Sequence, residues 1–126
     1  MKLIASALLG VLFLPFFTYA LPNTCFCVLF LREEMGVNIR GDAVQQISNI
    51  SKWNVDVGDV LLLQYGKVSH AALILGFEWE EGRQTPKSFK IIEANKVRCK
   101  VTIRDIAWSD EHIRGIYNPQ MSISAL

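Results

Sequence analysis

The chain is short of the residues that nucleic-acid-binding and metal-binding proteins depend on. Only two of its 126 residues are histidine and three are cysteine, and the 13 Lys and Arg barely exceed the 12 Asp and Glu. No basic run and no ladder of aromatic residues stands out, which excludes the usual nucleic-acid-binding surfaces. The few histidines and cysteines do not have the spacing of a metal-ligand cluster, so we expect neither a metal nor another cofactor.

The chain also lacks internal repeats, low-complexity tracts and linkers. A length of 126 residues leaves room for one domain, over residues 21–126, once the N-terminal segment is set aside. Without Lys2, the 13 basic residues become 12 and balance the 12 acidic ones. We therefore expect a single neutral domain that works as a monomer.

Residues 1–20 have one positive charge, at Lys2, followed by an apolar run that ends in Thr18-Tyr19-Ala20. These features are typical of a secretory signal peptide cut after Ala20. The run is also close to the length of about 20 residues that spans a bilayer, so an uncleaved membrane anchor is the alternative. In either case we expect an exported protein, located in the periplasm, in the cell envelope or outside the cell, that contacts a membrane only through this segment.

Three cysteines, Cys25, Cys27 and Cys99, are an odd number for an oxidising compartment. At least one of them stays free or pairs with a second chain. A Cys25–Cys99 disulfide that leaves Cys27 free is one arrangement, and three unpaired thiols are the other. The sequence leaves both open.

Helical periodicity appears first in the domain and strand periodicity follows. Asn23 or Thr24 can cap a helix that begins near Cys25 and stops at Gly36, and a short second helix is expected over 43–48. The apolar face of the first helix consists of Val28, Leu31 and Met35. Strands are expected over 60–64, 71–79, 89–93, 101–104 and 113–117, with one helical turn over 108–111. This order predicts an α+β fold in which N-terminal helices pack on an antiparallel sheet.

Four residues with reactive or polar side chains stand in apolar surroundings. Cys27 lies near the first turn of the predicted helix, where unpaired backbone N–H groups lower the pKa of a thiol. His70 starts one predicted strand and Glu93 ends the next, so the two can lie side by side in an antiparallel pair. Asn95 follows two residues later. A thiolate, an imidazole and a group that fixes the imidazole tautomer are the parts of a nucleophilic hydrolase.

The motifs around these residues resemble those of a known family. Cys-Val-x-Phe-x-x-x-x-x-Gly-x-x-Ile-x-Gly-Asp-Ala begins at Cys27, Val-Gly-Asp-Val-Leu precedes Ser-His-Ala-Ala-Leu-Ile at His70, and Ile-Glu-Ala-Asn ends at Asn95. Together they look like the CHAP domain, the cysteine, histidine-dependent amidohydrolase/peptidase family, over residues 25–118. The resemblance implies a papain-like α+β fold and hydrolysis of amide bonds in bacterial peptidoglycan, by an amidase or an endopeptidase, in cell-wall remodelling or phage lysis.

The resemblance also implies roles for single residues. Cys27 would be the nucleophile, His70 the general base and acid, Glu93 the residue that orients His70, and Asn95 a polar support of the site. The Cys27 backbone N–H would belong to the oxyanion hole, for which Asn23 is the one side-chain candidate upstream.

Three other functions remain in competition. A catalytically silent module that binds the cell wall would keep the same fold. An NlpC-type endopeptidase shares the order of cysteine before histidine but commonly uses a second histidine in the third place. A membrane-anchored structural protein would be held by residues 3–20.

Overall fold

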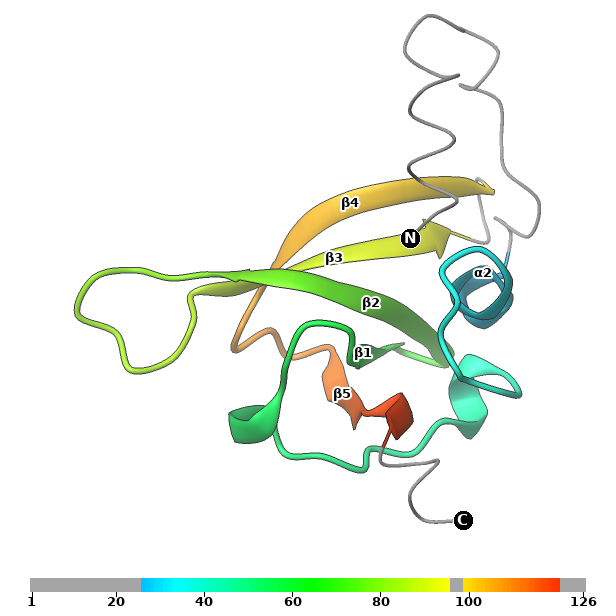
Figure 1. Ribbon diagram of the computed structural model, residues 1–126, viewed down its shortest axis with the longest axis horizontal. Coiled ribbons are helices and arrows are strands. Elements are labelled where there is room, and N and C mark those ends of the chain that lie inside the picture. The colour runs from blue at the N-terminus through cyan, green and yellow to red at the C-terminus, as the bar shows by residue number, and fades with distance from the viewer. Residues whose placement is uncertain (1–25, 96–98, 121–126) are drawn as a thin grey trace, which may run out of the picture.

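The computed structural model describes residues 26–95 and 99–120, and the expected signal peptide or anchor over residues 1–20 lies outside them. The described chain is an α+β fold with one antiparallel five-stranded sheet in the order β4-β3-β2-β1-β5 (Figure 1). Its elements are α2 (Cys27–Glu33), η2 (Ala43–Gln45), η3 (Lys52–Asn54), β1 (Val60–Tyr65), β2 (Val68–Glu78), β3 (Ser88–Asn95), β4 (Lys100–Ala107) and β5 (Ile113–Tyr117). The prediction of helices before an antiparallel sheet is confirmed.

The first helix is shorter than expected. It begins at Cys27, and its N-cap residue is Phe26, whose side chain makes no capping hydrogen bond. The prediction of a start near Cys25 was therefore wrong. The helix ends at Glu33, and the chain turns away before Gly36, which has a φ of 71° that suits glycine.

The five predicted strands are all present, and most are longer than expected because hairpin pairing continues beyond the apolar runs. The β2–β3 hairpin projects from the molecule (Figure 1). The expected helix over 43–48 is only the short 3₁₀ turn η2, since the backbone is already extended at Gln46. The segment expected as a helical turn over 108–111 forms non-helical turns instead, and η3 was not predicted.

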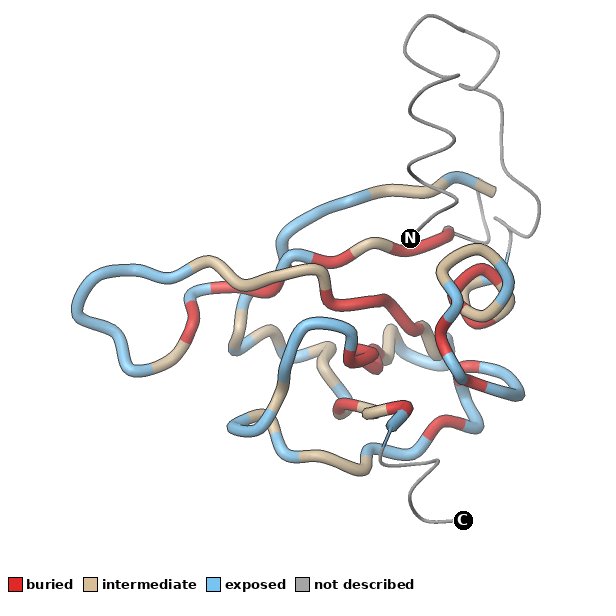
Figure 2. Tube along the Cα trace, in the orientation of Figure 1, coloured by how far each residue is buried: buried red, intermediate tan, exposed pale blue. Residues whose placement is uncertain are grey.

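The sheet buries apolar side chains on both faces, which explains its run of leucines. One cluster joins Val28, Phe30 and Leu31 of α2 to the β1 residues Val60 and Leu62. The other lies across the opposite face and consists of Leu61, Leu63, Ala72, Ile74, Phe89, Ile91, Ile106 and Ile116. Figure 2 shows this buried centre, while the tip of the β2–β3 hairpin is exposed.

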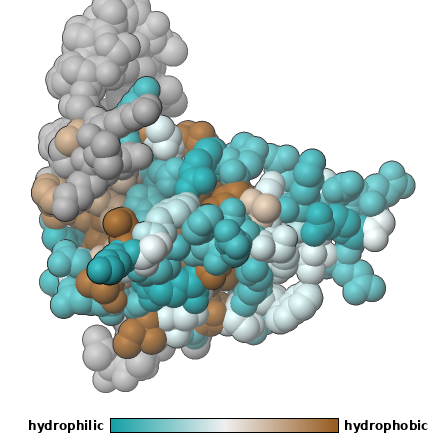
Figure 3. Space-filling view, turned by 180° about the vertical axis from the view of Figure 1, so that it is seen from behind, coloured by the Kyte–Doolittle hydropathy of each residue, from teal (hydrophilic) through white to brown (hydrophobic). Residues whose placement is uncertain are grey.

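The two ends of the molecule differ in character. The helix α2 lies beside the start of β2 and the end of β3, at the end of the sheet away from the projecting hairpin (Figure 1). In the rear view, hydrophilic side chains cover the hairpin, and apolar side chains gather toward the opposite end (Figure 3). Within residues 26–95 and 99–120, no helix is long and apolar enough to cross a bilayer.

Candidate active site

His70 and Glu93 lie on neighbouring strands and point to the same side of the sheet. Leu73 of β2 pairs with Ile92 of β3. Because side chains alternate between the two faces along a strand, His70 and Glu93 both leave the face opposite to that pair. Their side chains meet, with His70 Nε2 2.7 Å from Glu93 Oε1. The predicted juxtaposition of these two residues is therefore present.

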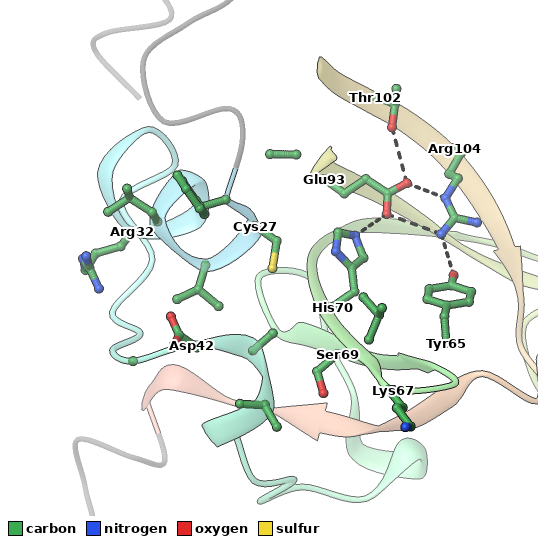
Figure 4. Close-up of a pocket in the computed structure, with 18 residues that line it drawn as sticks. Cys27, Arg32, Asp42, Tyr65, Lys67, Ser69, His70, Glu93, Thr102 and Arg104 are labelled. Atoms are coloured by element: carbon green, nitrogen blue, oxygen red, sulfur yellow. Dashed lines mark hydrogen bonds and ion pairs between the residues drawn. The ribbon is translucent and has the colours of Figure 1, made fainter. Parts of the chain in front are cut away.

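The thiol of Cys27 approaches His70 from the helix. Cys27 is the first residue of α2, is a free thiol, and lies close enough to His70 for the imidazole to lower the pKa of the thiol. Since Nε2 of His70 is engaged by Glu93, Nδ1 is the ring nitrogen left for the sulfur. Figure 4 shows the sulfur on the helix side of the cleft, with His70 between it and Glu93. The sequence order of thiol, imidazole and carboxylate thus becomes a spatial order.

The electrostatics of Cys27 and His70 favour an ion pair. Burial is the largest influence on each group and opposes its charge, raising the pKa of Cys27 and lowering that of His70. For Cys27 the hydrogen bond and charge of His70, with backbone N–H groups of Ala71 and Val28, outweigh burial and lower the pKa below 9.0. For His70 the partners Cys27 and Glu93 raise the pKa from 6.5 to about 9. Each group therefore favours the charged form of the other, so the pair tends toward thiolate and imidazolium.

Glu93 is held ionised although its side chain is only 8% exposed. Burial is the largest single influence and raises its pKa. Hydrogen bonds from His70 and Arg104, together with their charges, outweigh burial and lower the pKa from 4.5 to about 2. A buried carboxylate that remains charged can both orient the imidazole ring and stabilise its protonated form.

Three further residues complete the surroundings of Glu93, and sequence reasoning missed all of them. Arg104 donates from Nε to Glu93 Oε2 and from Nη2 to Oε1 at 3.3 Å. Thr102 Oγ1 donates to Oε2 at 3.3 Å, and Arg104 Nη2 donates to the Tyr65 hydroxyl at 2.9 Å (Figure 4). Thr102 pairs directly with Glu93 across β3 and β4. The sequence shows that Thr102 and Arg104 would share one face of a strand, but it does not show the strand register that places this face beside Glu93.

A cleft of about 910 Å³ lies in front of Cys27. Its walls come from α2, η2, the β1–β2 turn and β4. Much of the lining is apolar, and three of its side chains are large and exposed: Phe26 (55%), Val44 (70%) and Val68 (63%). The η2 wall is tied to the sheet by Arg114, which donates to the carbonyls of Gln46 at 2.7 Å and Ala43 at 2.9 Å. The free Cys27 thiol therefore faces a preformed, largely apolar cleft.

Asn95, the expected polar support of the site, is described only in its backbone. Asn95 ends β3 and pairs with Lys100, and its side chain lies outside the described part of the chain.

Cys99 is disulfide-bonded while Cys27 is free, so the alternative of three unpaired thiols was wrong. The expected partner Cys25 and the capping and oxyanion candidates Asn23 and Thr24 lie outside the described residues. In residues 26–95 and 99–120, no group of three or more His, Cys, Asp or Glu side chains is placed to hold a metal ion.

The lowered pKa of Glu93 predicts a loss of stability in acid. Its folded pKa of about 2 is below the ordinary 4.5, so its contribution is present above pH 4.5 and disappears as the pH falls toward 2. We expect Glu93→Gln to lower the free energy of unfolding at pH 7 by an amount on the order of 2 kcal/mol. Urea unfolding at pH 7 and pH 3 should show this deficit shrinking in acid.

The exposed pair Glu80–Arg83, with 3.9 Å between Oε2 and Nη1, supplies the control. Glu80→Gln should cost little at either pH because an exposed ion pair contributes little. A deficit for Glu93→Gln that is as large at pH 3 as at pH 7 would contradict the prediction.

Compared with known proteins, the chain matches no family model, no curated protein and no solved structure.

Proposed function

We propose that the chain is an exported cysteine hydrolase of the CHAP type, with a papain-like fold, that cleaves amide bonds in bacterial peptidoglycan. The observation that carries the proposal is the contact of a free Cys27 thiol with His70, whose other ring nitrogen is bound by Glu93, in an open cleft. Its motif residues resemble those of the CHAP family at the same three positions. We further propose that the exported protein acts on the cell wall as a monomer.

The arrangement supports a two-step reaction. The Cys27 thiolate attacks the amide carbonyl carbon, and the protonated His70 gives its proton to the nitrogen as the carbon–nitrogen bond breaks. An amine leaves and a thioester remains. Neutral His70 then takes a proton from water as the water oxygen attacks the thioester carbon. The carboxylic acid leaves, Cys27 departs as thiolate and His70 is again protonated.

The competing functions are weighed by the same contacts. An NlpC-type site commonly has a second histidine in the third place, whereas the residue on His70 Nε2 is Glu93. A silent wall-binding module has no need of an activated thiol, whereas here the hydrogen bonds and charge that His70 and the backbone N–H groups supply outweigh burial and lower the pKa of Cys27. Both comparisons favour the CHAP-type hydrolase.

Digestion of purified peptidoglycan followed by mass spectrometry of the soluble products tests the proposal. Amidase and endopeptidase products differ in mass, so the same spectra identify the bond that is cut. If the wild-type protein and Cys27→Ala release the same products in the same amounts, the chain is not this hydrolase.

The apolar rim of the cleft predicts how a substrate is held. Val44 is 70% exposed on the η2 wall, and a substrate group that covers it gains apolar contact. We expect Val44→Glu to lower kcat/KM about 10-fold to 100-fold, because a carboxylate cannot pack against an apolar group. The rate at which iodoacetamide alkylates Cys27 should stay within about twofold, since Val44 is not among the groups that set the thiol pKa.

Ile47 offers a matched control, because it is 77% exposed and does not line the cleft. Ile47→Glu should leave kcat/KM unchanged. An equal loss in both variants would show that added negative charge, and not contact at Val44, lowers turnover.

A further inference from the structure

Arg104 binds both oxygens of the Glu93 carboxylate. Its Nε donates to Oε2, and its Nη2 donates to Oε1 at 3.3 Å. This forked arrangement fixes the plane of a carboxylate more strictly than a single donor does. Arg104 reaches Glu93 because it pairs with Ile91 across β3 and β4 and so shares a strand face with Thr102, the direct partner of Glu93.

The orientation of the Glu93 carboxylate determines which of its oxygens His70 contacts. Oε1 accepts from His70 Nε2 at 2.7 Å, while Oε2 accepts from Arg104 and from Thr102. Rotation of the carboxylate would have to break the contacts to Arg104 and Thr102 together. The contact with His70 involves only one carboxylate oxygen, so by itself it would not prevent that rotation.

Arg104 needs support of its own, because its side chain is 41% exposed and long. Tyr65 accepts from Nη2 at 2.9 Å. The Tyr65 ring lies against the His112 ring, with centroids 4.6 Å apart, and His112 Nδ1 is 2.9 Å from Asp110 Oδ1. A line of contacts therefore runs from the β4–β5 turn to the carboxylate that orients the imidazole.

We propose that Arg104, held by Tyr65, is a positioning residue of the site, which fixes Glu93 so that Oε1 faces His70 Nε2. The inference rests on the proposed use of Cys27, His70 and Glu93, and goes beyond it by assigning a role to β1 and β4. Arg104 acts through Glu93 and His70 and does not take part in the bond changes.

The groups that surround the imidazole determine the pH behaviour expected of this arrangement. Cys27 faces His70 from α2 and Glu93 faces it from β3, while Arg104 from β4 contacts Glu93 and Tyr65 from β1 contacts Arg104. If Arg104 positions Glu93, its loss weakens the hydrogen bond to His70 and lowers the pKa of His70 from about 9. If Arg104 acted only as a nearby positive charge, its loss would favour imidazolium and raise that pKa instead.

The test uses the protein without substrate, so it does not depend on peptidoglycan. The protonation of His70 is followed by NMR from pH 5 to pH 10, and Cys27 is alkylated with iodoacetamide over the same range. For Arg104→Met we expect the His70 midpoint to fall by about one pH unit and alkylation at pH 7 to slow about fivefold to tenfold. Tyr65→Phe should shift both in the same direction by about a third as much.

Two variants distinguish the positioning role of Arg104 from the effect of its charge and from a general loss of structure. Arg104→Lys keeps the charge but not the fork, so it should fall between the wild type and Arg104→Met. Arg83→Met is the matched control, because Arg83 also pairs with a glutamate and is 38% exposed, but lies on the projecting hairpin. It should leave both titrations unchanged.

An unchanged or raised His70 midpoint in Arg104→Met would overturn the proposal, as would an Arg104→Lys protein that titrates like the wild type. If Arg104→Met does not fold, Tyr65→Phe and Arg104→Lys decide by the same measurements. Peptidoglycan that stays intact with the wild type would reject the proposed substrate and leave this test unaffected.

Discussion

Cys27→Ala is expected to abolish hydrolysis while the protein stays folded. The thiol is the nucleophile of the proposed reaction, so its loss should lower turnover by roughly four to six orders of magnitude. The substitution removes a half-buried sulfur at the start of α2 and leaves the core side chains of that helix in place. Release of soluble fragments from purified peptidoglycan measures the effect, and circular dichroism checks the fold.

Cys27→Ser is an informative companion. Serine keeps the position of the nucleophilic atom, but its hydroxyl is not ionised at neutral pH, so His70 must remove the proton during attack. We expect residual activity close to that of the alanine variant. Serine activity near the wild-type level would show that the Cys27–His70 ion pair is unimportant for the reaction.

His70→Ala is expected to remove both hydrolysis and the reactivity of the thiol. Hydrolysis should fall as far as in Cys27→Ala, because single losses within such a unit cost nearly as much as losing all of it. Without the imidazole, burial is the largest remaining influence on Cys27 and raises the pKa of the thiol, against the lowering by the backbone N–H groups of Ala71 and Val28. The thiolate fraction at pH 7 then falls, and iodoacetamide alkylation should slow by about 10-fold or more.

Added imidazole provides the second measurement for His70. In the space left by His70→Ala, it can again meet Glu93 Oε1 and the Cys27 sulfur, so part of the alkylation rate should return. Arg83→Met, whose substitution lies on the hairpin away from His70, should be alkylated at the wild-type rate with and without imidazole. Wild-type alkylation by His70→Ala in the absence of imidazole would mean that Cys27 is activated by other groups.

Much of the fold was predictable because the strands carry strong local signals. The apolar runs over 60–63 and 71–75 identify two strands whose centres are buried on both sides. The exact ends were less predictable. The helix begins at Cys27 because the backbone of Phe26 is extended, and η2 ends early because the backbone is extended at Gln46, whose side chain donates to the carbonyls of Arg40 and Asp42.

The members of the site differ in how far sequence could identify them. Cys27, His70 and Glu93 stand in motifs whose spacing marks them, and the structure brings all three together. Arg104 and Tyr65 stand in no such motif. Each is one more polar residue of a strand, and only the strand pairing of the sheet places Arg104 beside Glu93 and Tyr65 beside Arg104.

The kinds of element, their order and the three candidate side chains Cys27, His70 and Glu93 could be read from the sequence, because periodicity and residue chemistry are local properties. Their assembly into one site could not, because it follows from the packing of α2 on the sheet. The helix α2 packs against Ala71 and Ala94, whose side chains alternate with those of His70 and Glu93, so thiol and imidazole come from opposite faces of the sheet and meet at its end. That meeting depends on strand register and helix packing, which are set by contacts between residues far apart in the chain.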